Sequence, residues 1–273
     1  MSLFSLFSRS SFTPVWECSA RFVLWRVMFS GDGLIIAEDR DTESKTVTFF
    51  CLDEATGRIL WSGQNFGEPW WIGLLGVKDG TLYLHGYKKP DMPEHKHIFA
   101  VDVRTGGLKW KNSDCAFLAV SGTDVYGFKD LFERRVFYRI DGGTGVLLEE
   151  LTALPSDVDH NARYEKTDFR FPAAVPKDGS SVLLKHITGD AVASEYIAGE
   201  TFTVINTYER NLPPAEGMKN TLVVIDSVKN KRLYSDLLNT STPYPVPDSF
   251  FMDGDRLYYI KERTTLTAVQ LKR

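Results

Sequence analysis

The chain of 273 residues is 43% hydrophobic, 13% aromatic and 25% charged, which is the composition of a globular protein and excludes a disordered or fibrous chain. Its net charge of −4 gives no basic field to attract nucleic acid or an anionic membrane, so we expect neither as a partner. The three cysteines, Cys18, Cys51 and Cys115, are too far apart for a disulfide framework or a zinc site of the usual spacing.

The N-terminal segment MSLFSLFSRSSFTP has no basic region followed by a continuous apolar stretch, so it is not typical of a secretory signal. No window reaches the ~18 uninterrupted apolar residues of a membrane helix. We expect a cytoplasmic monomer in which residues 1–12 form a flexible tail and residues 13–273 form a single domain.

Five predicted hairpins follow one another along the chain, each with a short apolar run, a Gly-Asp or related turn and a second run with high strand propensity. Their period-2 alternation is typical of half-buried antiparallel strands. They span residues 21–40, 70–89, 115–130, 194–210 and 249–263.

A second hairpin follows most of these and repeats without gaps: LDEATGRILW (52–61), VDVRTGGLKW (101–110), IDGGTGVLLE (140–149) and IDSVKNKRLY (225–234). An Asp side chain at the start of each turn can accept backbone hydrogen bonds, and a residue four positions later can adopt a positive φ. The Asp positions are Asp53, Asp102, Asp141 and Asp226, and the turn residues are Gly57, Gly106, Gly145 and Asn230.

Four-stranded antiparallel units that recur every ~40–50 residues are typical of β-propeller blades. We predict an all-β propeller of five blades with an inserted hairpin in residues 151–191; if that insertion is a degenerate blade, the count is six. The strand at 266–271 lacks an outer partner, which the segment 13–18 can supply with Trp16 in the Trp position. The N-terminal strand would then close the ring and remove an exposed edge.

The repeat Asp-x-x-Thr-Gly-x-x-x-Trp resembles that of quinoprotein-like (PQQ-like) β-propellers. The resemblance implies that Trp61, Trp110 and Trp16 dock between adjacent blades and that the turn Gly permits this approach. The chain departs from the repeat at Glu149 and Tyr234. Quinone-dependent relatives carry adjacent cysteines, which this sequence lacks, so we expect no quinone and no other cofactor.

Two clusters of possible metal ligands are expected to be solvated loops without metal. His95 and His97 lie in a charged, Pro-containing connection, and Asp157, Asp159, His160 and Asn161 lie in the insertion without the spacing of an EF-hand.

The sequence favours a non-catalytic binding or scaffolding protein with a protein or small-molecule partner. Its predicted site lies where the apolar runs begin, at one end of the channel, and comprises Trp25, Arg26, Trp70, Trp71 and Tyr196. The competing interpretation is that these side chains fill the core. The alternative function is a hydrolase acting on a sugar or lactone at the channel mouth, for which the nearest acids are Glu68, Glu195 and Asp253.

Overall fold

The computed structural model describes residues 12–88, 94–175, 187 and 191–272, and in this part of the chain it contains strands and no helix. Of the predicted tail at residues 1–12, residues 1–11 lie outside the described residues, and Phe12 meets the Phe202 ring edge to face at 5.4 Å. The chain divides into two compact units: the three-sheet unit (Ala20–Thr167) and the two-sheet unit (Met1–Ser19 with Asp168–Arg273). Each is described by itself.

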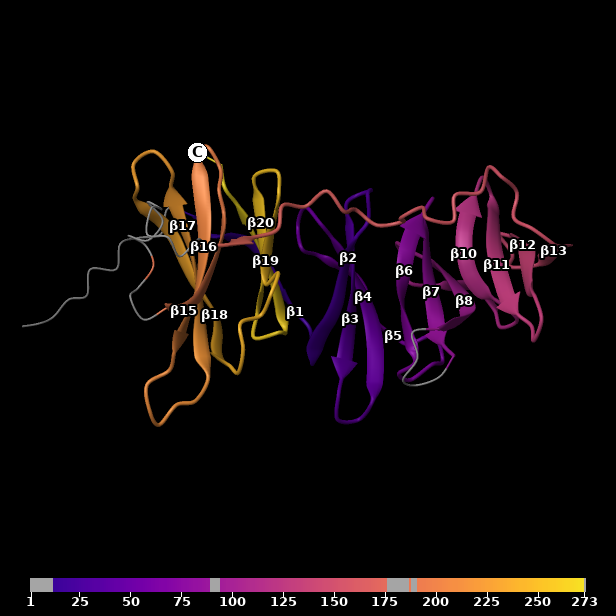
Figure 1. The fold of residues 1–273 in the computed structure, drawn as a ribbon, viewed down its shortest axis with the longest axis horizontal. Helices are drawn as coiled ribbons and strands as arrows, with labels where there is room; N and C mark the ends of the chain where they lie inside the picture. Colours follow the sequence, from indigo (N-terminus) through magenta and orange to yellow (C-terminus); the bar gives the residue numbers. More distant parts are fainter. Residues whose placement is uncertain (1–11, 89–93, 176–186, 188–190, 273) are drawn as a thin grey trace, which may run out of the picture. The chain divides into compact units, whose positions relative to one another are not determined.

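The three-sheet unit consists of three four-stranded antiparallel sheets whose strands follow one another in chain order (Figure 1). The first contains β2 (Val23–Phe29), β3 (Leu34–Asp41), β4 (Thr46–Asp53) and β5 (Ile59–Gln64). The second contains β6 (Ile72–Lys78), β7 (Thr81–Tyr87), β8 (His95–Asp102) and β9 (Leu108–Asn112). The third contains β10 (Ala116–Ser121), β11 (Asp124–Asp130), β12 (Arg135–Asp141) and β13 (Leu147–Leu151).

The two-sheet unit has a five-stranded and a four-stranded antiparallel sheet. The five-stranded sheet contains β14 (Ala173–Ala174), β15 (Ala191–Ile197), β16 (Phe202–Arg210), β17 (Met218–Asp226) and β18 (Arg232–Thr242). The four-stranded sheet has the order β1 (Pro14–Ser19), β21 (Thr265–Gln270), β20 (Arg256–Lys261) and β19 (Phe250–Asp253).

The predicted pairing of the N-terminal strand is confirmed, because β1 pairs antiparallel with β21, with Trp16 opposite Ala268 and Cys18 opposite Leu266. Trp16 and Cys18 are both buried. The predicted fold class is therefore confirmed as all-β, with four-stranded antiparallel blades and a last sheet built from both ends of the chain. The described residues form five sheets, the favoured count. The insertion contributes β14 to an existing sheet, and residues 176–186 and 188–190 of the predicted hairpin lie outside the described part.

The Asp-x-x-Thr-Gly turns form as predicted. Asp53 Oδ1 accepts hydrogen bonds from the Thr56 amide at 2.9 Å and the Thr56 hydroxyl at 2.6 Å, and Gly57 has a φ of 69°. Equivalent bonds link Asp102 to Thr105 and Asp141 to Thr144. In the degenerate copy Asn230 takes the positive φ of 55°. The hydrogen bond from the Thr56 hydroxyl is the largest of the contributions that lower the pKa of Asp53.

The inter-blade role of the tryptophans is observed within the three-sheet unit. Trp61 Nε1 donates to the carbonyl of Val103 at 2.8 Å, and its indole lies against Gly106, where an added Cβ would be 2.7 Å from the ring. Trp110 repeats the arrangement against the Gly142 carbonyl and Gly145.

The two residues that replace the Trp of the repeat, Glu149 and Tyr234, lie in different environments. Glu149 lies exposed and forms an ion pair with Arg139 at 3.2 Å. Tyr234 is buried, and its hydroxyl lies 2.6 Å from that of Tyr259 on the neighbouring sheet of the two-sheet unit. A phenol therefore replaces the indole at this junction and finds a polar partner, as a buried Tyr requires.

Four strands carry a β-bulge that the alternation pattern does not indicate: β2, β6, β10 and β15. The pairing register shifts between Leu24 and Arg26 on β2, and equivalent shifts occur on β6, β10 and β15. A bulge adds one unpaired residue and redirects side chains. On β2 the extra residue is Trp25.

The connection of residues 154–167 crosses the first strands of the three-sheet unit near their C-terminal ends, where Figure 1 shows it in salmon. Val158 is buried against Ala119 and Tyr126. The Tyr164 hydroxyl accepts a hydrogen bond from the Val120 amide at 2.7 Å, and the Lys166 amide donates to the Phe29 carbonyl at 2.8 Å. The connection thus covers the C-terminal ends of these strands. The candidate site described below lies nearer their N-terminal ends.

Candidate functional site

A buried ion pair on β3 organises the site. Arg40 and Glu38 have side chains only 4% and 3% exposed, and they contact each other at 2.8 Å. Arg40 also donates to the carbonyls of Trp70 and Ile72, and Glu38 Oε1 accepts the Leu74 amide at 2.9 Å. Because every partner is supplied by the fold, the two charges can remain buried and hold the start of β6 against β3.

Two tryptophans lie on this ion pair. The Arg40 guanidinium is 4.8 Å from the Trp70 ring and 5.6 Å from the Trp25 ring, and the two rings meet edge to face at 6.2 Å. Lys45 adds a second cation 5.2 Å from Trp70. Trp25 is 53% exposed, although its ring is held in place by the bulge and by Arg40. We call Trp25, Arg40, Lys45 and Trp70 the Trp25 surface.

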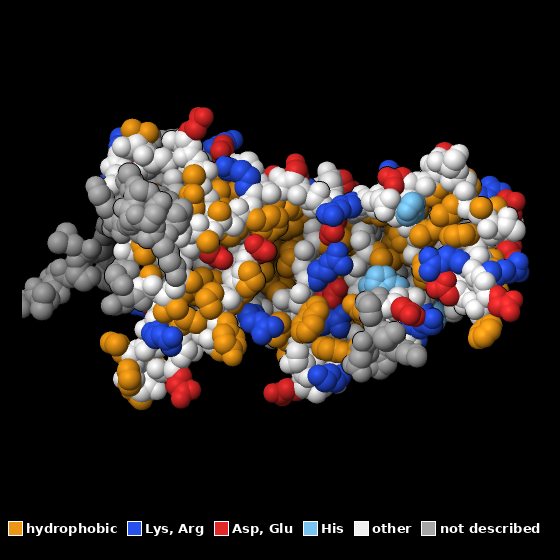
Figure 2. Space-filling view, in the orientation of Figure 1, with side chains coloured by type: hydrophobic (Ala, Val, Ile, Leu, Met, Phe, Trp, Pro, Cys, Tyr) orange, Lys and Arg blue, Asp and Glu red, His pale blue; other side chains and the backbone are white. Residues whose placement is uncertain are grey.

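The space-filling view shows the chemical character of this part of the molecule. Basic, acidic and hydrophobic side chains are interspersed over the region of β2 to β7 in Figure 2.

The predicted site residues have separate roles. Trp25 and Trp70 belong to the Trp25 surface, whereas Arg26 donates to the Leu74 carbonyl at 2.7 Å and forms an ion pair with Glu165 of the connection at 3.1 Å. Tyr196 lies on β15 of the two-sheet unit, where Ala173 is its cross-strand partner. The Trp25 surface therefore contains two of the five predicted residues.

Trp71 begins a row of ring contacts that leads to β8. It meets Tyr87 at 6.2 Å, Tyr87 meets His85 at 4.7 Å, and His85 stacks on His95 at 3.5 Å. The prediction that His95 and His97 lie in a loop is wrong, because both belong to β8. The His95 side chain is exposed, as predicted, and covers the buried His85 ring. Burial, followed by the neighbouring His95, lowers the pKa of His85 to about 3.

The buried His85 predicts a pH dependence of stability. Its pKa in the folded protein is below that of an unfolded histidine, so the unfolded state binds more protons below pH ~6.5 and stability falls as the pH decreases from there. Urea unfolding of wild type and His85→Phe between pH 6.5 and 4.5 is expected to show a slope about 1 kcal/mol per pH unit steeper in wild type. Parallel slopes would contradict a neutral, buried His85.

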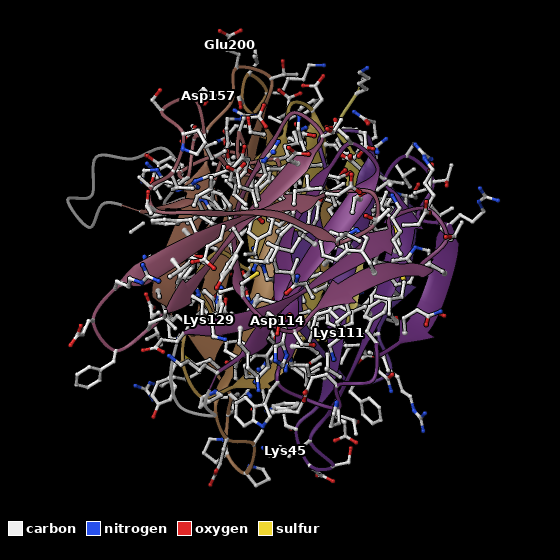
Figure 3. All side chains as sticks on the ribbon, turned by 90° about the vertical axis from the view of Figure 1, so that its right-hand side faces the viewer. Lys45, Lys111, Asp114, Lys129, Asp157 and Glu200 are labelled. Carbon is white, nitrogen blue, oxygen red and sulfur yellow. The ribbon has the colours of Figure 1, made fainter. Side chains whose placement is uncertain are left out.

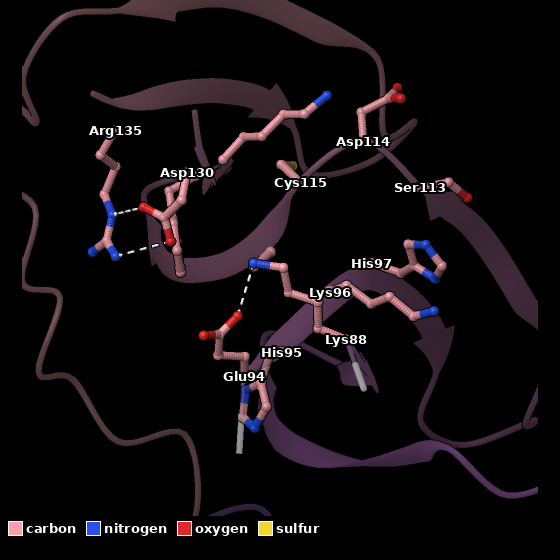
Figure 4. Close-up of a pocket in the computed structure, with 13 residues that line it drawn as sticks. Lys88, Glu94, His95, Lys96, His97, Ser113, Asp114, Cys115, Asp130 and Arg135 are labelled. Carbon is pink, nitrogen blue, oxygen red and sulfur yellow. Dashed lines mark hydrogen bonds and ion pairs between the residues drawn. The ribbon is translucent and has the colours of Figure 1, made fainter. Parts of the chain in front are cut away.

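A pocket of about 450 Å³ opens beside His95, between the second and third sheets (Figure 4). Figure 3 shows Lys45, Lys111, Asp114 and Lys129 toward one end of the sheets and Asp157 of the connection toward the other. The lining residues are Lys88, Glu94, His95, Lys96, His97, Ser113, Asp114, Cys115, Ala116, Phe128, Lys129, Asp130 and Arg135.

The cysteine that lines the pocket is not an activated nucleophile. Burial raises the pKa of Cys115 to about 11, so its thiol stays protonated at neutral pH and is a poor nucleophile. Within the described part of the chain, no group of three or more His, Cys, Asp or Glu side chains is arranged to hold a metal ion.

The acids considered for hydrolysis lie in different surroundings. Glu68 Oε1 accepts the Trp71 amide at 3.0 Å and so orders the backbone before β6. Glu195 on β15 has a pKa raised by burial and by Asp248, and Asp253 ends β19. Glu68 therefore has a structural partner, whereas burial disfavours the charged form of Glu195.

Sequence reasoning missed Glu38, Arg40 and Lys45. A signal was present in β3, LIIAEDRD, where four charged residues follow an apolar run in a strand that is buried almost throughout. Charges in a central strand indicate a buried polar network, because an unpaired buried charge is very costly.

Comparison with known proteins gives a family model and distant structures. Residues 29–110 match a domain of unknown function (DUF4905). That description assigns no activity. No curated protein matches the chain. Among the described residues, no helix is long and apolar enough to cross a membrane.

Three solved structures illustrate the structural matches. A europium-containing methanol dehydrogenase has a TM-score of 0.35 and 12% identity, with 96% of this chain and 54% of that chain covered, so the chain spans about half of its length. The β-propeller domain of the Trilobed protease from Pyrococcus furiosus has a TM-score of 0.32 and 12% identity, with 94% and 71% covered. The Dos1 propeller has a TM-score of 0.31 and 11% identity, with 92% and 68% covered. The fold assignment rests on the strand order and register described above.

Proposed function

We propose that the chain is a non-catalytic binding protein and that the Trp25 surface recognises a partner protein. The observation that carries this proposal is an exposed Trp25 that lies against a buried, hydrogen-bonded Arg40. Trp and Arg are the residue types most often responsible for binding energy at interfaces. A ring already held in position loses little conformational freedom when a partner covers it.

Lys45 makes the Trp25 surface selective for partners that carry a negative charge. Its ammonium group and the Arg40 guanidinium both lie near the Trp70 ring. A partner segment that combines an apolar or aromatic side chain with an acidic group would satisfy both features. Hydrolysis of a sugar or lactone is the weaker candidate, because it needs convergent acids and Glu68 already binds the backbone beside Trp71.

The proposal predicts that Trp25→Ala abolishes capture of a partner from a lysate of the source organism, while Phe132→Ala does not. Phe132 is a suitable control because it is a fully exposed aromatic residue in the β11–β12 turn. Quantitative mass spectrometry of material retained by each immobilised variant measures the outcome. A protein retained equally by wild type and Trp25→Ala would show that this surface does not bind it, and absence of any such difference would contradict the proposal.

A further inference from the structure

The pocket has two sides of different charge character. On one side, Lys88 and Glu94 form an ion pair at 2.8 Å, and Arg135 and Asp130 form a two-bond pair at 2.7 and 3.2 Å. On the other side, Figure 4 shows Lys96 and His97, with Ser113 nearby. The first side is internally neutralised, so the second determines which charged ligand can enter.

The backbone of His97 is unusual for a strand residue. Its φ is 58°, and the pairing register shifts beside it between His85 and Gly86. A Cβ on Gly86 would lie 3.2 Å from the Lys96 carbonyl oxygen and 3.5 Å from His97 Nδ1, so the glycine allows this close approach. A strained residue other than glycine at a pocket is a recognised mark of a functional position.

The lining carries excess positive charge. It includes four basic residues and three acidic ones, and Lys96 and Lys129 have no ion-pair partner within the described residues. Lys111 is also close enough to act on His97: burial, then Lys96 and Lys111, lower the pKa of the imidazole, against the opposing effects of Glu68 and Asp114. An anion beside Lys96 would relieve this concentration of charge.

The floor of the pocket is apolar. Ala116 and the neutral thiol of Cys115 are buried there, and the Phe128 ring lies under the Arg135 guanidinium at 4.2 Å. A volume of about 450 Å³ suits a small molecule rather than a protein loop. A fitting ligand therefore combines one anionic group with a compact apolar body.

We propose that this pocket binds a small organic anion, with its phosphate or carboxylate group beside Lys96 and His97 and its apolar body over Phe128 and Ala116. Lysine supplies a point charge to such a group, and a neutral imidazole can donate a hydrogen bond. This site is distinct from the Trp25 surface and does not depend on the function proposed for it.

Isothermal titration calorimetry with phenyl phosphate, phenylacetate and inorganic phosphate tests the proposal. We expect at least one aromatic anion to bind more tightly than inorganic phosphate, and we expect Lys96→Gln and His97→Gln each to weaken that binding at least tenfold. Lys45→Gln is the matched control and should retain wild-type affinity, as should Trp25→Ala. The identity of the bound probe distinguishes a phosphate from a carboxylate ligand.

Two results would overturn the proposal. One is the absence of binding by both aromatic anions, and the other is equal weakening by Lys96→Gln and Lys45→Gln, which would indicate general attraction of anions to the surface. Retained binding in Trp25→Ala together with loss of partner capture would separate this site from the proposed protein-binding function. The fold of each variant is checked by its thermal unfolding, and Lys96→Met provides a second variant that keeps the aliphatic chain.

Discussion

Deletion of residues 1–19 is expected to abolish cooperative folding of the two-sheet unit and to cause aggregation. The deletion removes β1, and with it the buried Trp16 and Cys18, from the edge of β21. Loss of a buried Trp alone costs about 3–5 kcal/mol, comparable to much of the stability of a typical domain. The exposed strand TLTAVQ would then present an unpaired apolar edge. Circular dichroism melting and size-exclusion chromatography measure the two effects.

The control for this deletion removes residues 1–11 only, which leaves β1 intact. We expect it to melt at the wild-type temperature and to elute as wild type does. If the longer deletion also stayed monomeric with an unchanged melting curve, the pairing of β1 with β21 would not contribute to stability, and closure of the last sheet by the N-terminus would be wrong.

Gly106→Val is expected to destabilise the protein by more than 3 kcal/mol. The positive φ of 72° by itself makes a β-branched residue cost about 1–3 kcal/mol. The new Cβ would also lie 2.7 Å from the Trp61 ring, which is buried and donates a hydrogen bond to Val103. Displacing this indole would open the junction between the first and second sheets. Urea unfolding gives the change in free energy.

Gly33→Val separates the two contributions. Gly33 has a φ of 80°, but no atom lies within 4 Å of an added Cβ, so this variant carries the backbone strain without the collision. We expect a cost of about 1–3 kcal/mol there. Equal costs at the two glycines would mean that the Trp61 contact contributes nothing and that the turn conformation explains the whole effect.

The turns and the strand order could be predicted because their causes are local. Asp53, Thr56 and Gly57 lie within five residues, and each contributes a hydrogen bond or a backbone conformation that its side chain favours. The pairing of β1 with β21 could be predicted because the repeat left one strand without a partner. Both inferences followed from the repeated turn motif and from the number of predicted strands in each blade.

The candidate site depended on contacts between distant segments, and for that reason much of it could not be predicted. The bulge at Trp25 exists only relative to the register of β3. The role of Arg40 depends on carbonyls of Trp70 and Ile72 that lie about thirty positions away in the chain. His95 had the composition of a solvated loop, and its stacking on His85 follows from the pairing of β8 with β7. Local composition carries no information on these contacts.

If Trp25 serves binding rather than packing, its removal should cost little stability, and the unfolding free energies of Trp25→Ala and Trp61→Ala measure that cost. Trp61 is buried at a sheet junction and Trp25 is 53% exposed, so the two substitutions remove the same side chain from opposite environments. We expect a loss of about 3–5 kcal/mol for Trp61→Ala and less than about 1 kcal/mol for Trp25→Ala. A loss for Trp25→Ala as large as that for Trp61→Ala would show that Trp25 is part of the core and would contradict the proposed recognition surface.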